Sequence, residues 1–530
     1  MTAKTIGRAA LILAIFTLLS RVVGLVRDLI LASTFGAGDT LDAYYAAFRA
    51  PDFIFNFFIL GTLTVAFLPI FNRELVTNKE SAERLAGVVS TVSILFISIL
   101  ALISFIFAPY LVDLVAPGFG GEKRELTIML TRILMLSPII FTASTMSSII
   151  LQSHNRFFPT AVAPIFYNVG IITGAVVFYR FWGVAGLTFG VIAGAAAHSV
   201  INLLPLRHLP IRIRPSLKFD LPAVKEVGRL YLPRLFAFDN LQISLFVGSI
   251  IGSLLASGSI TIFNFAENIQ AAPLGIFALS FSVAVFPALS QSWALKKYEE
   301  FKEIITRTVV QILFFIVPIS IFVFLMRAQI VRLLLGRGKF GWEETILTAQ
   351  TLGVLALSLS AQSLTPLLAR AFYATQNTVV PVVVSIVTAV TNVILAVQFS
   401  KNLGVVGLGL AASAAAVVSL FMLVALLRSR IGKWDILSVI EKILKILIST
   451  SLAGTALYAT LYAIAPIVDT HTTLGILVQT ALASIVGASI YLVVALILNL
   501  REARQLVLTV RTWLFRLSKP AFILFEPGDR

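Results

Sequence analysis

Apolar stretches of about twenty residues recur along the whole chain, separated by short polar segments. A helix needs about 20 apolar residues to cross the roughly 30 Å hydrocarbon core of a bilayer. Of the 530 residues, 58% are hydrophobic and only 12% are charged, whereas soluble domains carry about 25% charged residues. The stretches are continuously apolar rather than alternating, which excludes a transmembrane β-barrel. The sequence therefore predicts an all-α, polytopic membrane protein.

Hydropathy places fourteen transmembrane helices in the chain. Their predicted ranges are 9–34, 43–71, 85–115, 126–152, 158–180, 184–205, 222–252, 259–292, 304–326, 345–374, 379–399, 404–428, 437–465 and 473–498. Lys and Arg gather in alternate connecting segments, and the positive-inside rule assigns those segments to the cytoplasm. The net charge of +16 therefore reflects membrane orientation, and we expect no nucleic-acid partner. Both termini are predicted to be cytoplasmic.

The residue types that build metal and catalytic sites are scarce. The chain has no Cys and four scattered His, without the spacing of a zinc site. It also lacks a phosphate-binding glycine loop, a nucleophile motif and paired carboxylates in an exposed loop. We therefore expect no cofactor, no metal and no enzyme activity.

Residues 500–530, beyond the last predicted span, combine apolar residues with several Arg and one Lys. This pattern predicts a basic amphipathic helix on the cytoplasmic membrane surface. Anionic membrane lipids are its expected partners.

Four landmarks in the sequence recur at a spacing of 221 or 222 residues. The paired segments are 154–168 with 375–392, 183–190 with 404–411, 49–58 with 271–280, and 118–126 with 339–347. Each copy holds six predicted helices, an even number, so both copies insert the same way up. Parallel repeats of this kind are typical of transporters that alternate access around a site between the halves.

The repeat defines the predicted domain boundaries. We expect an N-terminal six-helix bundle at 1–215 and its repeat at 216–431. Two further transmembrane helices occupy 432–499, and the basic tail occupies 500–530.

The first predicted span carries three charges within the segment "SRVVGLVRD". Arg21 and Asp28 are seven positions apart and share a helix face, while Arg27 lies about 100° around the helix. A charged side chain at the bilayer centre costs roughly 2.5–3.5 kcal/mol on insertion scales and is usually paired or functional. The second span repeats the pattern, because Asp42 and Arg49 are also seven positions apart.

Two interpretations of these charges are open. They can form ion pairs that hold the first two helices together, or they can line a water-filled cavity. Arg21 and Arg27 outnumber the single carboxylate of their helix. Surplus guanidinium groups suit a phosphate-bearing substrate, because the planar guanidinium fork binds two phosphate oxygens. We therefore predict a substrate site at Arg21, Arg27, Asp28, Asp42 and Arg49.

Of the corresponding helices of the second half, the eighth carries no arginine but several acidic and amide residues, so the predicted cavity is positive on its first-half wall only. Glu267 suits either proton coupling or a neutral structural hydrogen bond. The candidate residues for a secondary cavity or for coupling are Asp52, Asn56, Asp239, Glu267, Asn268 and Arg370.

The chain resembles a known family, the bacterial lipid II flippases (MurJ or MviN). The segments that carry the resemblance are "SRVVGLVRD", "FGAGDTLDAYYAAFRAPD", "AFLPIF", "APGF", "NRFFPTAVAPIFYN" and "AFYATQNTVVP", in order between about 7 and 430. The resemblance implies the fold of the multidrug/oligosaccharidyl-lipid/polysaccharide exporters. It also implies the substrate, undecaprenyl-pyrophosphate carrying the peptidoglycan disaccharide-peptide, and the bacterial inner membrane as location.

The resemblance further implies residue roles. Arg21, Arg27, Asp28 and Asp42 correspond to the central cationic cavity of the family, and helices 13 and 14 to a groove for the lipid tail. We expect the protein to act as a monomer.

This chain departs from the family pattern at several positions. Family arginines of the second and eighth helices are replaced here by Phe55 or Asn56 and by Asn268. Some members have a sodium-binding carboxylate four residues after the asparagine that corresponds to Asn392, and here that position is Ala396. The resemblance therefore implies a cavity with fewer arginines and an incomplete sodium site.

Other functions stay open at the level of sequence. One is export of another lipid-linked oligosaccharide or of an amphipathic drug, and another is a non-transporting membrane scaffold of the same fold. A membrane glycosyltransferase is disfavoured because the predicted outer loops are short. The surplus charge of the first helix favours transport, because a scaffold has no need for it.

Overall fold

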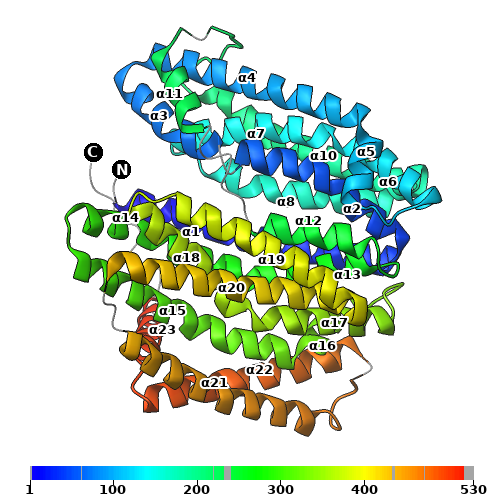
Figure 1. Ribbon diagram of the computed structural model, residues 1–530, viewed down its shortest axis with the longest axis vertical. Coiled ribbons are helices and arrows are strands. Elements are labelled where there is room, and N and C mark those ends of the chain that lie inside the picture. The colour runs from blue at the N-terminus through cyan, green and yellow to red at the C-terminus, as the bar shows by residue number, and fades with distance from the viewer. Residues whose placement is uncertain are drawn as a thin grey trace. The chain divides into compact units, whose positions relative to one another are not determined.

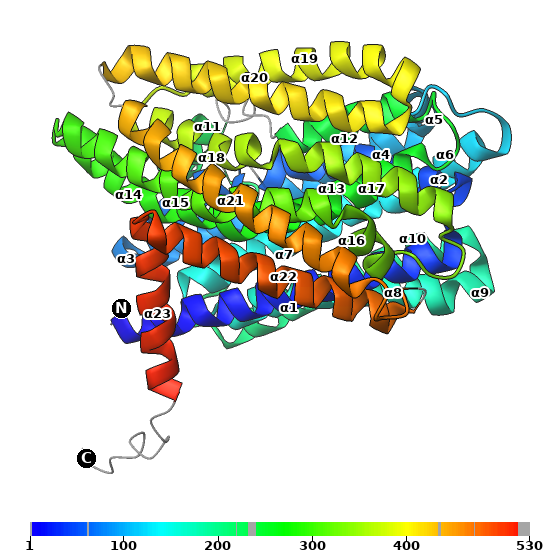
Figure 2. The same ribbon diagram turned by 90° about the horizontal axis from the view of Figure 1, so that it is seen from below.

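The computed structural model describes residues 3–60, 63–218, 220–231, 240–432, 436–470 and 472–517. Within these ranges every regular element is a helix (Figures 1 and 2). Among the described residues ten helices are long and apolar enough to span a membrane, or up to eleven if α17 (Trp342–Leu357) and α18 (Leu359–Ala374) form one bent span. The prediction of an all-α, polytopic membrane protein is confirmed.

The predicted count of fourteen spans is not established by these helices. The eleven correspond to predicted spans three to six and eight to fourteen. The first predicted span is α1 (Ala3–Phe35), which carries the three charges. The second and seventh predicted spans each include residues outside the described ranges.

The helices occur twice in the same order and with similar lengths, with α8 and α9 of the first series together corresponding to α19 of the second. The first series comprises α2 (Asp39–Phe55), α3 (Leu63–Thr77), α4 (Lys79–Ile106), α5 (Ala108–Val115), α6 (Gly121–Leu134), α7 (Leu136–Ser153), α8 (Phe158–Thr173), α9 (Tyr179–Trp182) and α10 (Val184–Leu203). The second comprises α13 (Ser259–Pro273), α14 (Ser280–Ala294), α15 (Tyr298–Leu325), α16 (Arg327–Leu334), α17, α18, α19 (Val379–Leu403) and α20 (Val405–Ile431).

Backbone conformations recur at the same offset as the sequence landmarks. Asn155 and Gln376, which are 221 residues apart, both have a left-handed conformation, with φ of 63° and 58°. Gly183 and Gly404, also 221 apart, have φ of 56° and 55°. Each pair ends one helix and begins the next, so the two series share their turns as well as their helices.

The chain forms two compact units. Unit 1 comprises Met1–Ala272, Ile330–Leu355 and Thr378–Ser419. Unit 2 comprises Pro273–Gln329, Ala356–Asn377 and Leu420–Arg530. Unit 1 contains the whole first series and part of the second, whereas unit 2 contains no helix of the first series.

Small residues set the packing of unit 1. Helices α8 and α10 pack through facing glycines (Figure 1), and a Cβ atom added at Gly170 would lie 2.3 Å from the Cα atom of Gly194. A Cβ atom at Gly190 would lie 2.4 Å from the Cα atom of Gly174. Close backbone approach through small residues is typical of helix pairs in membranes.

Unit 2 contains α14, α15, α18 and the C-terminal helices α21 (Ile436–Ile464), α22 (Thr473–Ile497) and α23 (Arg501–Leu517). The Tyr491 hydroxyl of α22 donates a hydrogen bond of 2.6 Å to the carbonyl oxygen of Phe314 on α15. The basic tail predicted at 500–530 is helical to residue 517, and 518–530 lie outside the described residues.

Candidate functional site

The first charged cluster is centred on Arg27 and Asp28 of α1. The Nε and Nη2 atoms of Arg27 donate hydrogen bonds of 2.9 and 2.8 Å to one oxygen of Asp28. The Nη1 atom donates a bond of 3.0 Å to the side-chain oxygen of Asn168 on α8. The second oxygen of Asp28 accepts a bond of 3.3 Å from the Asn268 amide on α13. Three helices therefore share one ion pair.

The orientation of the Asn168 side chain is set by hydrogen bonds on its own helix. It lies near Gly24, where an added Cβ atom would make an ordinary contact of 3.8 Å with the Asn168 amide oxygen. The Asn168 amide nitrogen also donates to the carbonyl oxygen of Pro164 at 3.1 Å, a carbonyl in the preceding turn of its own helix. The Asn168 side chain is thus held with its oxygen toward Arg27.

The cluster is largely enclosed but not sealed. The side chain of Asp28 is 6% exposed and that of Arg27 is 22% exposed. The Arg27 side chain therefore keeps part of its surface exposed while its charge is balanced by Asp28.

A second buried arginine lies on α2. Arg49 donates a hydrogen bond through Nη2 to the side-chain oxygen of Asn264 on α13. Its Nε atom has no hydrogen-bond partner in the described part of the chain, and neither has the hydroxyl of Tyr45 one turn earlier. Asp52 is partly buried on the same helix, and its carbonyl oxygen accepts a bond of 2.9 Å from the Asn56 amide.

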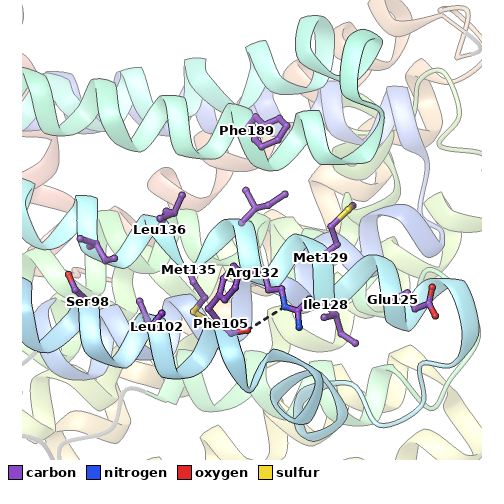
Figure 3. A pocket seen from close by; sticks show the side chains of 13 residues that line it. Ser98, Leu102, Phe105, Glu125, Ile128, Met129, Arg132, Met135, Leu136 and Phe189 are labelled. Atoms are coloured by element: carbon purple, nitrogen blue, oxygen red, sulfur yellow. Dashed lines mark hydrogen bonds between the residues drawn. The ribbon is translucent and has the colours of Figure 1, made fainter.

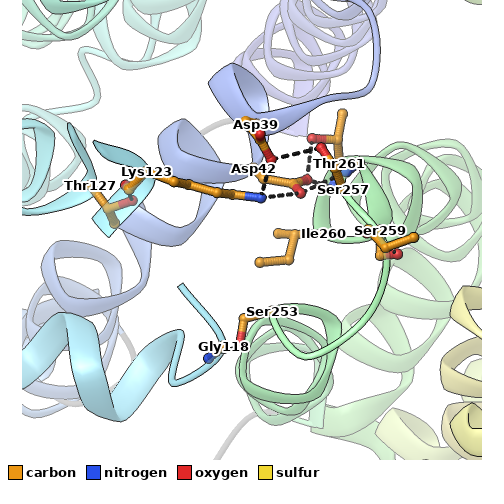
Figure 4. A network of polar contacts seen from close by, with 12 residues as sticks. Asp39, Asp42, Gly118, Lys123, Thr127, Ser253, Ser257, Ser259, Ile260 and Thr261 are labelled. Atoms are coloured by element: carbon orange, nitrogen blue, oxygen red, sulfur yellow. Dashed lines mark hydrogen bonds and ion pairs between the residues drawn. The ribbon is translucent and has the colours of Figure 1, made fainter. Parts of the chain in front are cut away.

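The third cluster holds the start of α2 against the start of α13 (Figure 4). One oxygen of Asp42 accepts hydrogen bonds from the backbone N–H and the hydroxyl of Thr261, at 2.9 and 2.8 Å. The other oxygen accepts bonds from the N–H of Gly258 at 2.7 Å and from Nζ of Lys123 at 3.0 Å. Asp42 is only 1% exposed, and each oxygen of this buried carboxylate accepts two hydrogen bonds.

Asp39 extends this cluster toward its exposed edge. One of its oxygens accepts bonds from Nζ of Lys123 at 2.6 Å and from the hydroxyl of Ser257 at 2.7 Å. These two hydrogen bonds hold the pKa of the Asp39 carboxyl below its ordinary value. Its side chain is 65% exposed, so the resulting stabilisation is screened by water.

The backbone around the third cluster requires glycine. Gly258 has φ of +90°, and a Cβ atom there would lie 2.4 Å from the carbonyl oxygen of Ala37. The N–H of Gly118 donates a bond of 3.0 Å to the hydroxyl of Ser253, again at a backbone approach too close for a Cβ atom. The loops at this end of unit 1 therefore meet by direct backbone contact.

The remaining predicted residues are not among the partners described above for these clusters. Arg21 is partly exposed and makes no ion pair within the described residues; Asp28 binds the adjacent Arg27 instead. Glu267 is buried on α13 and accepts a bond of 3.0 Å from the hydroxyl of Ser244. Arg370 lies on α18 in unit 2, and Asp239 lies outside the described residues.

The structure also shows site residues that the sequence analysis did not select. They are Asn168, Lys123, Thr261 and Asn264, each of which binds a predicted charge. Asn168 and Asn264 are polar residues within apolar helices, which is the one signal that could have indicated them. Among the described residues, no group of three or more His, Asp or Glu could hold a metal ion.

Chemically, the clusters place charged side chains between helices. Four of these charges accept hydrogen bonds from groups on other helices or donate them to such groups, namely Arg27, Asp28, Asp42 and Arg49. None of the four is bound by the residue seven positions away. A twice-repeated helix order with charges bound between helices inside a membrane protein is the architecture of a secondary transporter.

Comparison with known proteins identifies the kind of transporter. The sequence model of the lipid II flippase MurJ family matches residues 31–479. A probable lipid II flippase MurJ of Thermotoga maritima is 30% identical over 442 residues, 83% of this chain and 88% of the relative. One from Rhizobium tropici is 27% identical over 503 residues, 91% and 92% of the two chains. The chain therefore belongs to the lipid II flippase MurJ family, which confirms the resemblance seen in the sequence.

Solved structures support the same fold. A lipid II flippase MurJ in an inward closed conformation matches with a TM-score of 0.77 and 24% identity, over 94% of this chain and all of that one. An inward-facing multidrug resistance transporter of the MATE family matches with a TM-score of 0.66 and 17% identity, over 80% of this chain and 98% of that one.

Proposed function

We propose that the protein moves lipid II, the undecaprenyl-pyrophosphate-linked peptidoglycan precursor, from the inner to the outer leaflet of the bacterial inner membrane by alternating access. Membership of the lipid II flippase MurJ family supports the substrate. The observation that carries the proposal is Arg27, whose ion pair with Asp28 is bound by groups of two further membrane helices while its side chain as a whole is still 22% exposed. Transport of this kind breaks no covalent bond, so it requires neither an enzyme activity nor a cofactor.

In this proposal the pyrophosphate competes with Asp28 for Arg27. A guanidinium binds phosphate oxygens in the same planar fork with which it binds a carboxylate. Asp28 keeps a hydrogen bond from Asn268 when the arginine turns to the substrate. Arg21, which has no ion-pair partner among the described residues, supplies a second positive charge.

The Asp42 cluster closes one end of the pathway in this proposal. Its hydrogen bonds join α2 of the first series to α13 of the second. Those bonds must break for the substrate to leave at that end, so Asp42 takes part in gating. Arg49 lies deeper on α2 and offers an unpaired Nε atom to the substrate or to water.

The coupling residues form a separate part of the proposal. Glu267, Asn268, Asp52, Asn56, Asp239 and Arg370 are candidates for a secondary cavity or for coupling. The family sodium site lacks its carboxylate here, because position 396 is alanine.

We further propose the domain boundaries and the topology. The two six-helix bundles are 1–215 and 216–431, followed by helices 13 and 14 and a basic tail on anionic lipids, in a protein that acts as a monomer. Both termini are cytoplasmic in this scheme. Because the chain has no cysteine, single cysteines at positions 80 and 215 test it: impermeant maleimide should label them only in inverted vesicles. Labelling in right-side-out cells would contradict the topology.

The function itself is tested with purified protein in liposomes that contain fluorescent lipid II. We expect the protein to expose the inner-leaflet lipid II to an external reagent, and liposomes without protein to show little exposure. Lipid-linked O-antigen sugars and an amphipathic cationic dye serve as competing substrates. If the protein moves either competing substrate but not lipid II, that molecule takes the place of lipid II as the proposed substrate. If it moves none of the three, the result favours a non-transporting scaffold.

A further inference from the structure

An apolar groove lies on the surface of unit 1 and shares no lining residue with the charged clusters described above. Its volume is about 780 Å³, within the range of about 300–1,000 Å³ typical of small-molecule sites. Residues of α4, α6, α7 and α10 line it (Figure 3). Leu102, Phe105, Met129, Leu136 and Phe189 line it, and all five are more than a third exposed. In a membrane protein such side chains face lipid.

One cation lies in this apolar lining. The Arg132 guanidinium lies 5.5 Å from the centre of the Phe105 ring, and its Nε atom donates a long bond of 3.4 Å to the Phe105 carbonyl oxygen. Within the described residues no carboxylate forms an ion pair with it. A guanidinium within a membrane span needs an anionic partner, and phosphate oxygens bind it through charge-assisted, bidentate hydrogen bonds.

A single acidic residue also lines the groove. Glu125 lies on α6 seven residues before Arg132, so it is on the same face and about 10.5 Å nearer the start of the helix. It forms no ion pair in the described part of the chain, whereas the neighbouring Arg124 is bound to Asp113 at 2.6 Å. Along α6 toward the loop that precedes it, the groove therefore presents first the positive charge of Arg132 and then the negative charge of Glu125.

We propose that this groove binds one phospholipid with an amine headgroup, such as phosphatidylethanolamine. An acyl chain lies along the apolar lining, the phosphate binds Arg132, and the ammonium group lies near Glu125. The order of the two charges matches the order of phosphate and amine from the bilayer core outward. Glu125 disfavours a lipid with a net negative charge, which distinguishes the site from a general anionic patch.

The test uses delipidated full-length protein in liposomes with a photoactivatable phosphatidylethanolamine, and peptide mapping locates the labelled residues. We expect labelling on α4, α6 and α10 within the groove. Arg132→Gln should reduce it about tenfold, as expected for loss of one charge-assisted hydrogen bond. Glu125→Gln should leave labelling by this lipid but increase labelling by a matched phosphatidylglycerol probe.

Arg124→Gln is the matched control, because Arg124 is on the same helix and its ion pair with Asp113 is outside the groove. It should not change the labelling. Labelling of Arg132→Lys, which keeps the charge, should lie between that of the parent and that of Arg132→Gln. An unchanged melting temperature shows that each variant is folded. Equal labelling in Arg132→Gln and the parent, or stronger parental labelling by phosphatidylglycerol, would overturn the proposal.

Discussion

Arg27→Ala is expected to stop lipid II translocation. In the structure Arg27 donates two hydrogen bonds to Asp28 and one to Asn168. Its removal takes away the proposed pyrophosphate ligand and leaves the Asp28 carboxylate without its cation. Breaking a buried ion pair costs about 3–5 kcal/mol, and the 22% exposure of Arg27 puts the cost near the lower value. The measurement is lipid II exposure in liposomes, normalised to inserted protein.

Two further variants separate binding from stability. Arg27→Lys keeps the charge but loses the planar fork, so we expect at least a tenfold loss of rate with little loss of melting temperature. The double variant Arg27→Gln, Asp28→Asn removes both charges and keeps neutral hydrogen-bonding groups. It should be as stable as the parent and still inactive.

The control for this series is Arg73→Gln. Arg73 lies on α3 in an exposed ion pair with Glu226 at 2.6 Å, and exposed pairs contribute about 0–1 kcal/mol. Its loss should affect neither stability nor transport. A double variant of Arg27 and Asp28 that transports lipid II at the parental rate would show that the pair only joins helices.

Asp42→Asn is expected to open the end of unit 1 that the Asp42 cluster closes. All four partners of Asp42 are donors, so the asparagine N–H₂ group would face donors where an acceptor is required. Leaving buried donors unsatisfied costs about 1–3 kcal/mol and more where a charge is involved. A change of about 2–3 kcal/mol shifts the closed-to-open ratio roughly 30- to 150-fold.

The measurement is the labelling rate of a single cysteine placed at Ile260, a fully buried position beside the cluster. A water-soluble maleimide should label this cysteine far faster in the Asp42→Asn background than in the parent. Asp39→Asn is the matched control, because Asp39 shares Lys123 but is 65% exposed. It should change the rate by no more than about fivefold. Equal rates for Asp42→Asn and the parent would contradict a gating role.

The sequence was sufficient to predict the helical membrane fold and the repeat. Apolar stretches of membrane length leave few alternatives to helices. The repeat was detectable because turns such as those at Gly183 and Gly404 require a left-handed backbone and so preserve their residues. Both signals are local, and a single sequence contains them in full.

The partners of the charges could not be predicted in the same way. Helix periodicity placed Arg21 with Asp28, but the long Arg27 side chain reaches the adjacent carboxylate while Asn168 holds its other end. Lys123 is 81 residues from Asp42, and Thr261 is 219 residues from it. Such contacts depend on how α2, α6 and α13 pack, which periodicity along one helix does not contain.

Two of the four bonds that Asp42 accepts come from main-chain N–H groups, those of Gly258 and Thr261. Every residue except proline supplies such a group. The carboxylate thus depends on the backbone path of the facing segment at the start of α13 more than on the side chains of that segment. The copy that provides those donors is therefore free to diverge in side-chain identity after a duplication, whereas the copy that provides the aspartate is not. A gate of this kind tolerates unequal evolution of its two sides, provided that the glycine preserves the turn.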